Sequence, residues 1–200
     1  MFDEHLTMTD HVNSIVRRAS FGLRKIGRIR KMLDRNATEK LVHAFVSSHL
    51  DSCNSLLLGL PSSSLIKLQR VQNSAARLVS RSPFREHITP VLQALHWLPM
   101  EARVEYKTLL LVHTCLYQKA PEYISGLVCL HESTRKLRSS NTGLLKEPTC
   151  KTVSYGMHSF QIQAPKLWNK LPIEMRNETK LVTFKSKLKT ILFKRSYGVI

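Results

Sequence analysis

Apolar residues recur at three- and four-residue intervals through most of the chain, and this helical spacing constrains the fold more than any other feature. The first such segment contains Val12, Ile15, Val16, Ala19, Leu23, Ile26, Ile29 and Leu33. Further amphipathic helices are predicted over about 36–58, 65–79, 91–95, 101–117, 121–128 and 183–194. The pattern therefore predicts a mainly α-helical protein.

Local residue chemistry predicts where several helices begin. Thr9 is a suitable cap for the first helix. Asn36, with Glu39 three residues later, matches a capping box that opens the second helix. Pro61 ends that helix, and Pro90 suits the first turn of a short one.

A change in composition divides the chain into three parts. Residues 1–130 are expected to form a helical domain, and the polar, basic segment 131–150 a linker or loop. Residues 151–200 are expected to form a small α+β or irregular extension. In it, two short strands lie around Tyr155 and Gly156, and a terminal helix follows.

The charge balance points to a polyanionic partner. The 200 residues include 31 Lys and Arg but only 14 Asp and Glu, for a net charge of +17, and 42 % are hydrophobic, enough to fill a core. No apolar stretch approaches the roughly 20 residues of a membrane span, and the first ten residues lack a signal-peptide core. A cytoplasmic or nuclear protein with unpaired cysteines, rather than a secreted one, is expected.

Five cations of the first helix form the best binding candidate, which we call the basic stripe. At 100° per residue they leave the helix within about 60° of one another, on the side opposite the apolar residues. Its members are Arg17, Arg24, Arg28, Lys31 and Arg35. Guanidinium and ammonium groups in a row can meet successive phosphates, although a solvated helix face would look the same.

Other basic clusters are weaker candidates. They comprise the loop 80–86, the run with Arg135, Lys136 and Arg138, and the last helix with Lys185, Lys187, Lys189, Lys194 and Arg195. For the second and third clusters, nucleic-acid contact and solvation explain the sequence equally well.

Chemical motifs are sparse. His113 and Cys115, like Cys129 and His131, stand two residues apart, and in a helix such side chains point about 160° away from each other, which opposes zinc binding. The polar run 49–53 offers no oriented nucleophile. We therefore expect no metal, no cofactor and no catalytic residue. The rings of His96, Trp97 and Trp168 suit the core better than a base-stacking role.

A series of phrases, in order, resembles the region downstream of the polymerase palm in LINE-type, jockey-like non-LTR retrotransposons. They are FDEHLTMTDHV, FVSSHLDSCNSLLLGLP, LQRVQNSAARLV, HITPVLQALHWLP, RKLRSS, APKLWNKLP and FKSKLKTILF. They are spread over nearly the whole chain. The resemblance implies that residues 1–130 are thumb-like and that the chain begins inside a reverse transcriptase, at an internal methionine.

The resemblance also implies what the chain would do. A thumb holds primer and template, so the expected partner is an RNA·DNA hybrid or duplex bound without sequence preference. The polymerase site of that family needs adjacent metal-binding aspartates. Here the aspartates are Asp3, Asp10, Asp34 and Asp51, none beside another. We expect a non-catalytic fragment of an RNA-directed DNA polymerase.

Two other functions remain open. In the first, the chain is a helical protein-interaction module or a relic, and an exposed apolar face would drive self-association. Peripheral membrane binding through the first helix ranks last, because that helix lacks Trp and has only Phe21 near its polar side.

Overall fold

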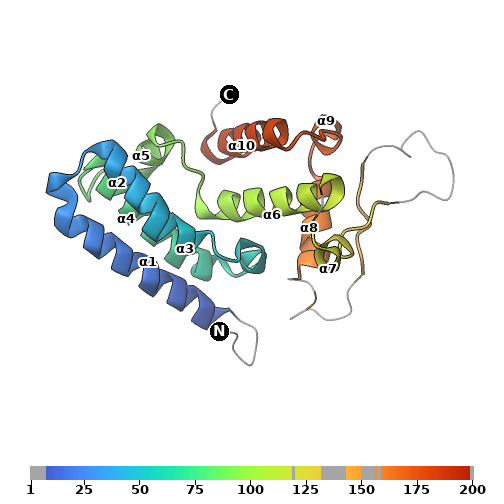
Figure 1. Cartoon of the computed structure of the whole chain (residues 1–200), viewed down its shortest axis with the longest axis horizontal. Helices are drawn as coiled ribbons and strands as arrows, with labels where there is room; N and C mark the ends of the chain where they lie inside the picture. The colour runs from blue at the N-terminus through green and yellow to red at the C-terminus, as the bar shows by residue number, and fades with distance from the viewer. Residues whose placement is uncertain (1–7, 119, 132–142, 150–155, 157–158, 199–200) are drawn as a thin grey trace.

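The computed structural model describes residues 8–118, 120–131, 143–149, 156 and 159–198. Every element in these ranges is helical, apart from one isolated β-bridge between Leu130 and Leu145. The mainly α fold predicted from apolar spacing is therefore confirmed. Figure 1 shows a bundle formed by the first half of the chain, from which one long helix leads to a smaller group of helices.

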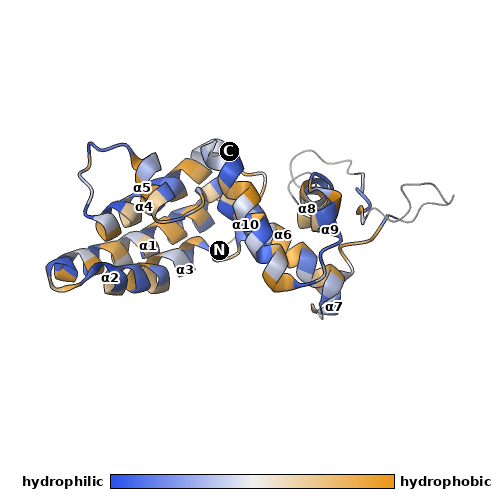
Figure 2. Cartoon of the chain, turned by 90° about the horizontal axis from the view of Figure 1, so that it is seen from above, coloured by the Kyte–Doolittle hydropathy of each residue, from blue (hydrophilic) through white to orange (hydrophobic). Residues whose placement is uncertain are grey.

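The first bundle is built on α1, which lies along its outer edge and packs on α4 and on the segment after α2 (Figure 1). The buried face of α1 includes Val12, Ile15, Ala19 and Ile26, as the spacing predicted. Hydrophobic and hydrophilic residues alternate along the helix (Figure 2). The elements are α1 Thr9–Ile29, η1 Arg30–Met32, α2 Arg35–Val42, η2 His43–Ser47, α3 Ser48–Leu50, η3 Asn54–Leu57, α4 Ser62–Ser80 and α5 Ile88–Ala94.

The second helix contains a π-helical turn, η2, between α2 and α3. Gly22 of α1 faces this turn, and a Cβ at Gly22 would lie 2.7 Å from the carbonyl oxygen of Phe45. Real Cβ atoms do not approach an oxygen so closely. The missing side chain of Gly22 therefore lets α1 and η2 pack against each other.

The predicted boundaries of the first two helices are wrong. α1 ends at Ile29, and the 3-10 turn η1 and the extended residue Leu33 separate it from α2. Asp34 rather than Asn36 caps α2, because its carboxylate accepts the backbone N–H of Ala37 at 2.6 Å. Aspartate is as good a cap as asparagine, and it stands two residues earlier.

The cap predicted for α1 is wrong by one residue. Met8 occupies the N-cap position and makes no side-chain cap hydrogen bond, so Thr9 is the first helical residue.

A second group of helices follows α6. α10 lies over α6 in Figure 1, and the rings of Trp168 and Phe184, 5.7 Å apart, lie in the core between these helices and α8. α6 contributes to both cores, with Val104 in the first and Leu109 in the second. The elements are α6 Met100–Tyr117, α7 Glu122–Ser125, α8 Phe160–Asn169, α9 Ile173–Arg176 and α10 Leu181–Tyr197.

The C-terminal extension is helical wherever it is described. α8 begins at Phe160, so the strand expected there is wrong for residues 160–163, and most of the remaining strand region lies outside the described residues. Of the expected linker 131–150, residues 143–149 lie against α8. The side chain of Asn169 bonds the N–H and C=O of Leu145 at 2.8 and 3.0 Å, and Trp168 donates its indole N–H to Gly143.

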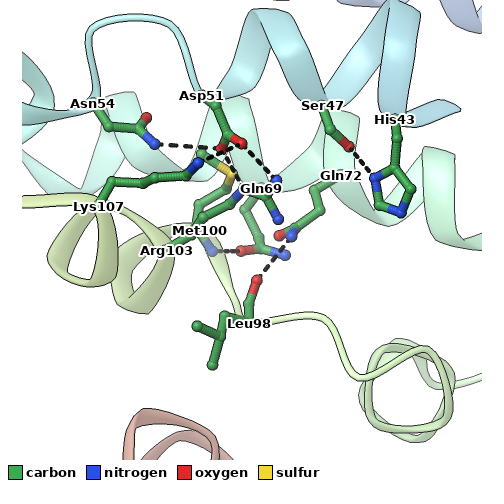
Figure 3. Close-up of polar contacts among 10 residues, drawn as sticks. All are labelled: His43, Ser47, Asp51, Asn54, Gln69, Gln72, Leu98, Met100, Arg103 and Lys107. Atoms are coloured by element: carbon green, nitrogen blue, oxygen red, sulfur yellow. Dashed lines mark hydrogen bonds and ion pairs between the residues drawn. The ribbon is translucent and has the colours of Figure 1, made fainter. Parts of the chain in front are cut away.

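A polar network, drawn in Figure 3, sets α6 against the bundle. The guanidinium of Arg103 donates two hydrogen bonds to the carboxylate of Asp51, and Lys107 Nζ lies 3.5 Å from the same group. Burial raises the pKa of Asp51, but the hydrogen bond from Arg103 and the charges of both cations outweigh it and hold that pKa below its usual value.

Two glutamines of α4 hold the start of α6 (Figure 3). Gln69 Oε1 accepts the N–H of Met100 at 2.7 Å, and Gln72 Nε2 donates to the carbonyl of Leu98 at 2.8 Å. Because the N–H of Met100 belongs to the first turn of α6, it has no partner within that helix. α4 therefore fixes where α6 begins.

Candidate nucleic-acid interface

Three members of the basic stripe lie on the solvent-facing side of α1. Arg17, Arg24 and Arg28 are all exposed, on the side opposite the buried face. At 1.5 Å per residue, the row they form is roughly 16 Å long. The arrangement of these three side chains agrees with the prediction from helical spacing.

The other two members lie beyond the end of α1, so the prediction of one continuous helix face is wrong for them. Lys31 belongs to η1, and Arg35 is the first residue of α2. Both are exposed. The basic stripe is therefore a row of three arginines followed by two cations at the corner where the chain turns.

Nothing in the described part of the chain neutralises the basic stripe. None of its five members forms an ion pair or a side-chain hydrogen bond there. The one acidic side chain within residues 12–35 is Asp34, which is held by the N–H of Ala37. Two further cations of α1, Arg18 and Lys25, are also exposed. The charge of this surface is thus available to a partner.

Arg30, in the same segment, has a different role that was not predicted. It is only 8 % exposed, and its guanidinium donates to the carbonyls of Leu33, Leu78 and Val79 at 2.7 to 3.0 Å. Burial, and then the charge of Arg81, lower its pKa. The last carbonyls of α4 lack helical partners, so Arg30 caps that helix. One signal was available: Arg30 follows buried Ile26 by four residues and shares its side of the helix.

The basic residues elsewhere in the chain differ in whether they form ion pairs. On α10, Lys187 pairs with Glu178 at 2.9 Å and Arg195 pairs with Glu105 of α6. The remaining exposed cations of that helix are Lys185, Lys189 and Lys194. The predicted contacts Arg135, Lys136 and Arg138 lie outside the described residues.

The aspartates are separated in space as well as in sequence. Asp10 is exposed in the first turn of α1, Asp34 caps α2, and Asp51 is bound by Arg103; Asp3 lies outside the described residues. In the described ranges, no three His, Cys, Asp or Glu side chains come close enough to hold a metal ion.

His113 is a buried core residue. Its Nε2 lies 2.8 Å from the carbonyl oxygen of Glu178, and its ring stacks on Phe184 with centroids 4.3 Å apart. Burial lowers the pKa of this imidazole, so the neutral form is favoured. The two tryptophans, Trp97 and Trp168, are buried as predicted, whereas His96 is exposed.

The cysteines also lie outside any cluster in the described part of the chain. Cys53 and Cys129 are exposed, Cys115 is half-buried, and all three are free thiols. Burial raises the pKa of Cys115, which disfavours its reactive thiolate form.

A mainly apolar groove of about 350 Å³ lies between the η3 region, α4 and α6. Ile66, which lines this groove, is 49 % exposed, and nearby Leu56 is 36 % exposed. The groove lining includes Leu57, Leu60, Leu65, Ile66, Met100 and Val104, with the acidic residues Glu101 and Glu105.

No family model, curated protein or solved structure matches the chain. Among the described helices, none combines the length and the apolar character that a bilayer crossing requires.

Proposed function

We propose that this chain holds nucleic acid by its phosphate backbone, as the thumb-like part of a LINE-type reverse transcriptase whose chemistry is carried out elsewhere. The partner is an RNA·DNA hybrid or a duplex, bound without sequence preference. In this proposal the chain has no catalytic step of its own.

The proposal rests on the basic stripe, whose five cations are exposed and have no ion-pair partner among the residues that the structure describes. Like charges in a row repel one another, and a binding partner with negative charge removes that repulsion. Each phosphate that a cation meets also releases condensed counterions, which favours binding further. Five cations with a single acidic residue, Asp34, in their segment are therefore better stabilised by a bound polyanion than by water alone.

The length of the row fits a nucleic-acid backbone. The rise along one strand of a duplex is about 3.4 Å per nucleotide, so the roughly 16 Å between Arg17 and Arg28 corresponds to about five steps. Arginines in a row along one exposed helix face can each meet a phosphate oxygen, and contacts to phosphates carry no sequence information. Binding of this kind is independent of sequence.

Fluorescence anisotropy with a labelled RNA·DNA hybrid tests the proposal. Duplex DNA, single strands and heparin serve as competitors. We expect the hybrid to be displaced by duplex at similar concentration, and by heparin only at a clear excess of negative charge. Equal displacement by heparin, charge for charge, would show that the chain attracts any polyanion and would refute the proposed role.

A second function is favoured by the apolar groove beside Leu57 and Met100, together with exposed Ile66. Such a surface suits a protein partner, including a second copy of the chain. Analytical ultracentrifugation separates the two functions. A dimer that dissociates when Ile66 is changed to Ser, combined with no hybrid binding, would favour the interaction module.

A further inference from the structure

Two loops meet at one end of the first bundle, and we call them together the bundle tip: residues 30–34, between α1 and α2, and residues 81–87, between α4 and α5. Arg30 bonds the carbonyls of Leu78 and Val79, and Arg81 donates to the carbonyl of Leu33 at 3.4 Å. These bonds hold the two loops side by side. The connection between α4 and α5 extends from the bundle in Figure 2.

The bundle tip presents an aromatic ring to solvent. Phe84 is 88 % exposed, as is Met32 on the neighbouring loop. The backbone that carries the ring lies in a turn closed by the Glu86 N–H, which donates to the carbonyl of Pro83 at 3.2 Å. Arg77 secures this turn by donating to the carbonyl of Glu86 at 3.0 Å, and its guanidinium carbon lies 5.4 Å from the Phe84 ring centroid.

Both loops of the bundle tip are rich in basic residues. Residues 28–35 contain four basic side chains and one acidic, and residues 77–87 contain three basic and one acidic. The acids are Asp34, which is occupied as the cap of α2, and Glu86, which is exposed. Within the described ranges, Lys31, Arg35 and Arg85 have no ion-pair partner. An exposed aromatic ring on a surface rich in cations is the chemistry that binds single-stranded nucleic acid.

We propose that Phe84 stacks on an unpaired base next to the duplex held by the basic stripe. The stripe leads to this place, since Arg28 lies in the last turn of α1 and Lys31 and Arg35 belong to the corner that forms the bundle tip. Arg81 and Arg85 contact the phosphates of the single strand, while the Phe84 ring takes the base. This inference rests on the proposed function and adds the kind of nucleic acid preferred: a hybrid or duplex with a single-stranded extension.

The test compares a blunt RNA·DNA hybrid with the same hybrid carrying an overhang of about five nucleotides, by anisotropy. Wild type is expected to bind the overhang form at least roughly fivefold more tightly, which is the lower end of what stacking one base contributes. Phe84→Ala and Phe84→Leu should abolish this advantage, whereas Phe84→Trp should retain it. Tyr123→Ala is the matched control, because Tyr123 is an aromatic residue that is 76 % exposed on α7.

Each alternative outcome is distinct. Equal affinity of wild type for both hybrids would overturn the inference, and so would an overhang advantage that survives in Phe84→Ala. In either case the proposed function would still be supported if binding of the blunt hybrid depends on the basic stripe. If Phe84→Leu retained the overhang advantage, the contact at residue 84 would be apolar rather than a stacking contact. This result would also overturn the inference. Phe84-dependent capture by phosphatidylserine vesicles, without an overhang advantage, would assign the bundle tip to membranes instead.

Discussion

Tyr197 donates its hydroxyl to the carbonyl oxygen of Trp97 at 2.6 Å, so the last turn of α10 is bonded to the loop between α5 and α6. A few residues earlier, Arg195 pairs with Glu105 of α6. The end of α10 is thereby attached to the first bundle as well as to its own group of helices. Folding of the two groups is therefore expected to be cooperative.

The first prediction concerns this attachment. Tyr197→Phe should lower the free energy of unfolding by about 1 kcal/mol, because it leaves the Trp97 carbonyl without its donor. Urea unfolding followed by tryptophan fluorescence measures the change. Unaltered stability would mean that the end of α10 is not attached in solution.

The same residue predicts an alkaline effect. Burial raises the pKa of Tyr197 to about 12, above its ordinary value of 10. The folded state then holds a proton that the unfolded state releases, so this contribution to stability is complete below pH 10 and is lost as the pH rises towards 12. Between these limits the Tyr197→Phe variant should lose less stability than wild type. Tyr106 and Tyr117, whose pKa values burial also raises, contribute to the loss that the variant still shows.

A pair of glycines in α1 gives a matched comparison. Gly22→Ala places a methyl group against the carbonyl of Phe45 and should destabilise the protein by about 1–3 kcal/mol. Gly27→Ala meets no atom within 4 Å and should stabilise it by roughly 0.5–1 kcal/mol, since alanine favours a helix. Thermal melts of both variants measure the signs. Two changes of the same sign would contradict the close packing of α1 on η2.

His113 predicts a loss of stability in mild acid. Its folded pKa lies below the ordinary 6.5 because of burial, so the unfolded state binds the proton first. Its contribution is complete above about pH 6.5 and falls as the pH drops through the folded pKa. Urea unfolding at several pH values should show this fall in wild type and a smaller one in His113→Gln. Equal falls would place the acid sensitivity elsewhere.

The ion pair between Asp51 and Arg103 gives another prediction. Asp51→Asn should lower the free energy of unfolding by about 1–3 kcal/mol, because it leaves the guanidinium of Arg103 without its carboxylate. Since the folded pKa of Asp51 is held low, the pair should lose its effect only below about pH 4. A double-mutant cycle with Arg103→Met measures the coupling, and additive changes would exclude it.

Most helices were predictable because their signals are local. The apolar spacing of α4, α6 and α10 placed these helices to within a few residues. The break after α1 was not predictable, since Ile29 and Leu33 continue the helical spacing. The chain breaks there because Arg30 binds carbonyls of α4 nearly fifty residues away, a tertiary contact that spacing does not reveal.

Alternation misled the prediction for the start of α8. Phe160 and Ile162 alternate with two glutamines, which is the pattern of a strand, but Ile162 and Ala164 are buried on a helix that continues to Trp168. In the candidate site, helical spacing correctly placed Arg17, Arg24 and Arg28 together. Phe84 was not predicted as a site residue, because the exposure of its ring depends on how the turn is held. Contacts from α4, among them those of Arg77, hold that turn, and the sequence does not reveal them.

The most direct test of the central claim is the salt dependence of hybrid binding between about 50 and 200 mM salt. Two variants with equal loss of charge are compared: Arg17→Ala, Arg24→Ala and Arg28→Ala together on α1, and Lys185→Ala, Lys189→Ala and Lys194→Ala together on α10. α1 and α10 lie on different sides of the molecule in Figure 1.

We expect the α1 variant to bind more weakly, with a slope of log affinity against log salt that is shallower by about 0.9 per lost contact, or roughly 2.7 in all. The α10 variant should keep a slope close to that of wild type. Equal slopes in the two variants, or an α1 variant indistinguishable from wild type, would contradict the claim that the basic stripe binds nucleic acid.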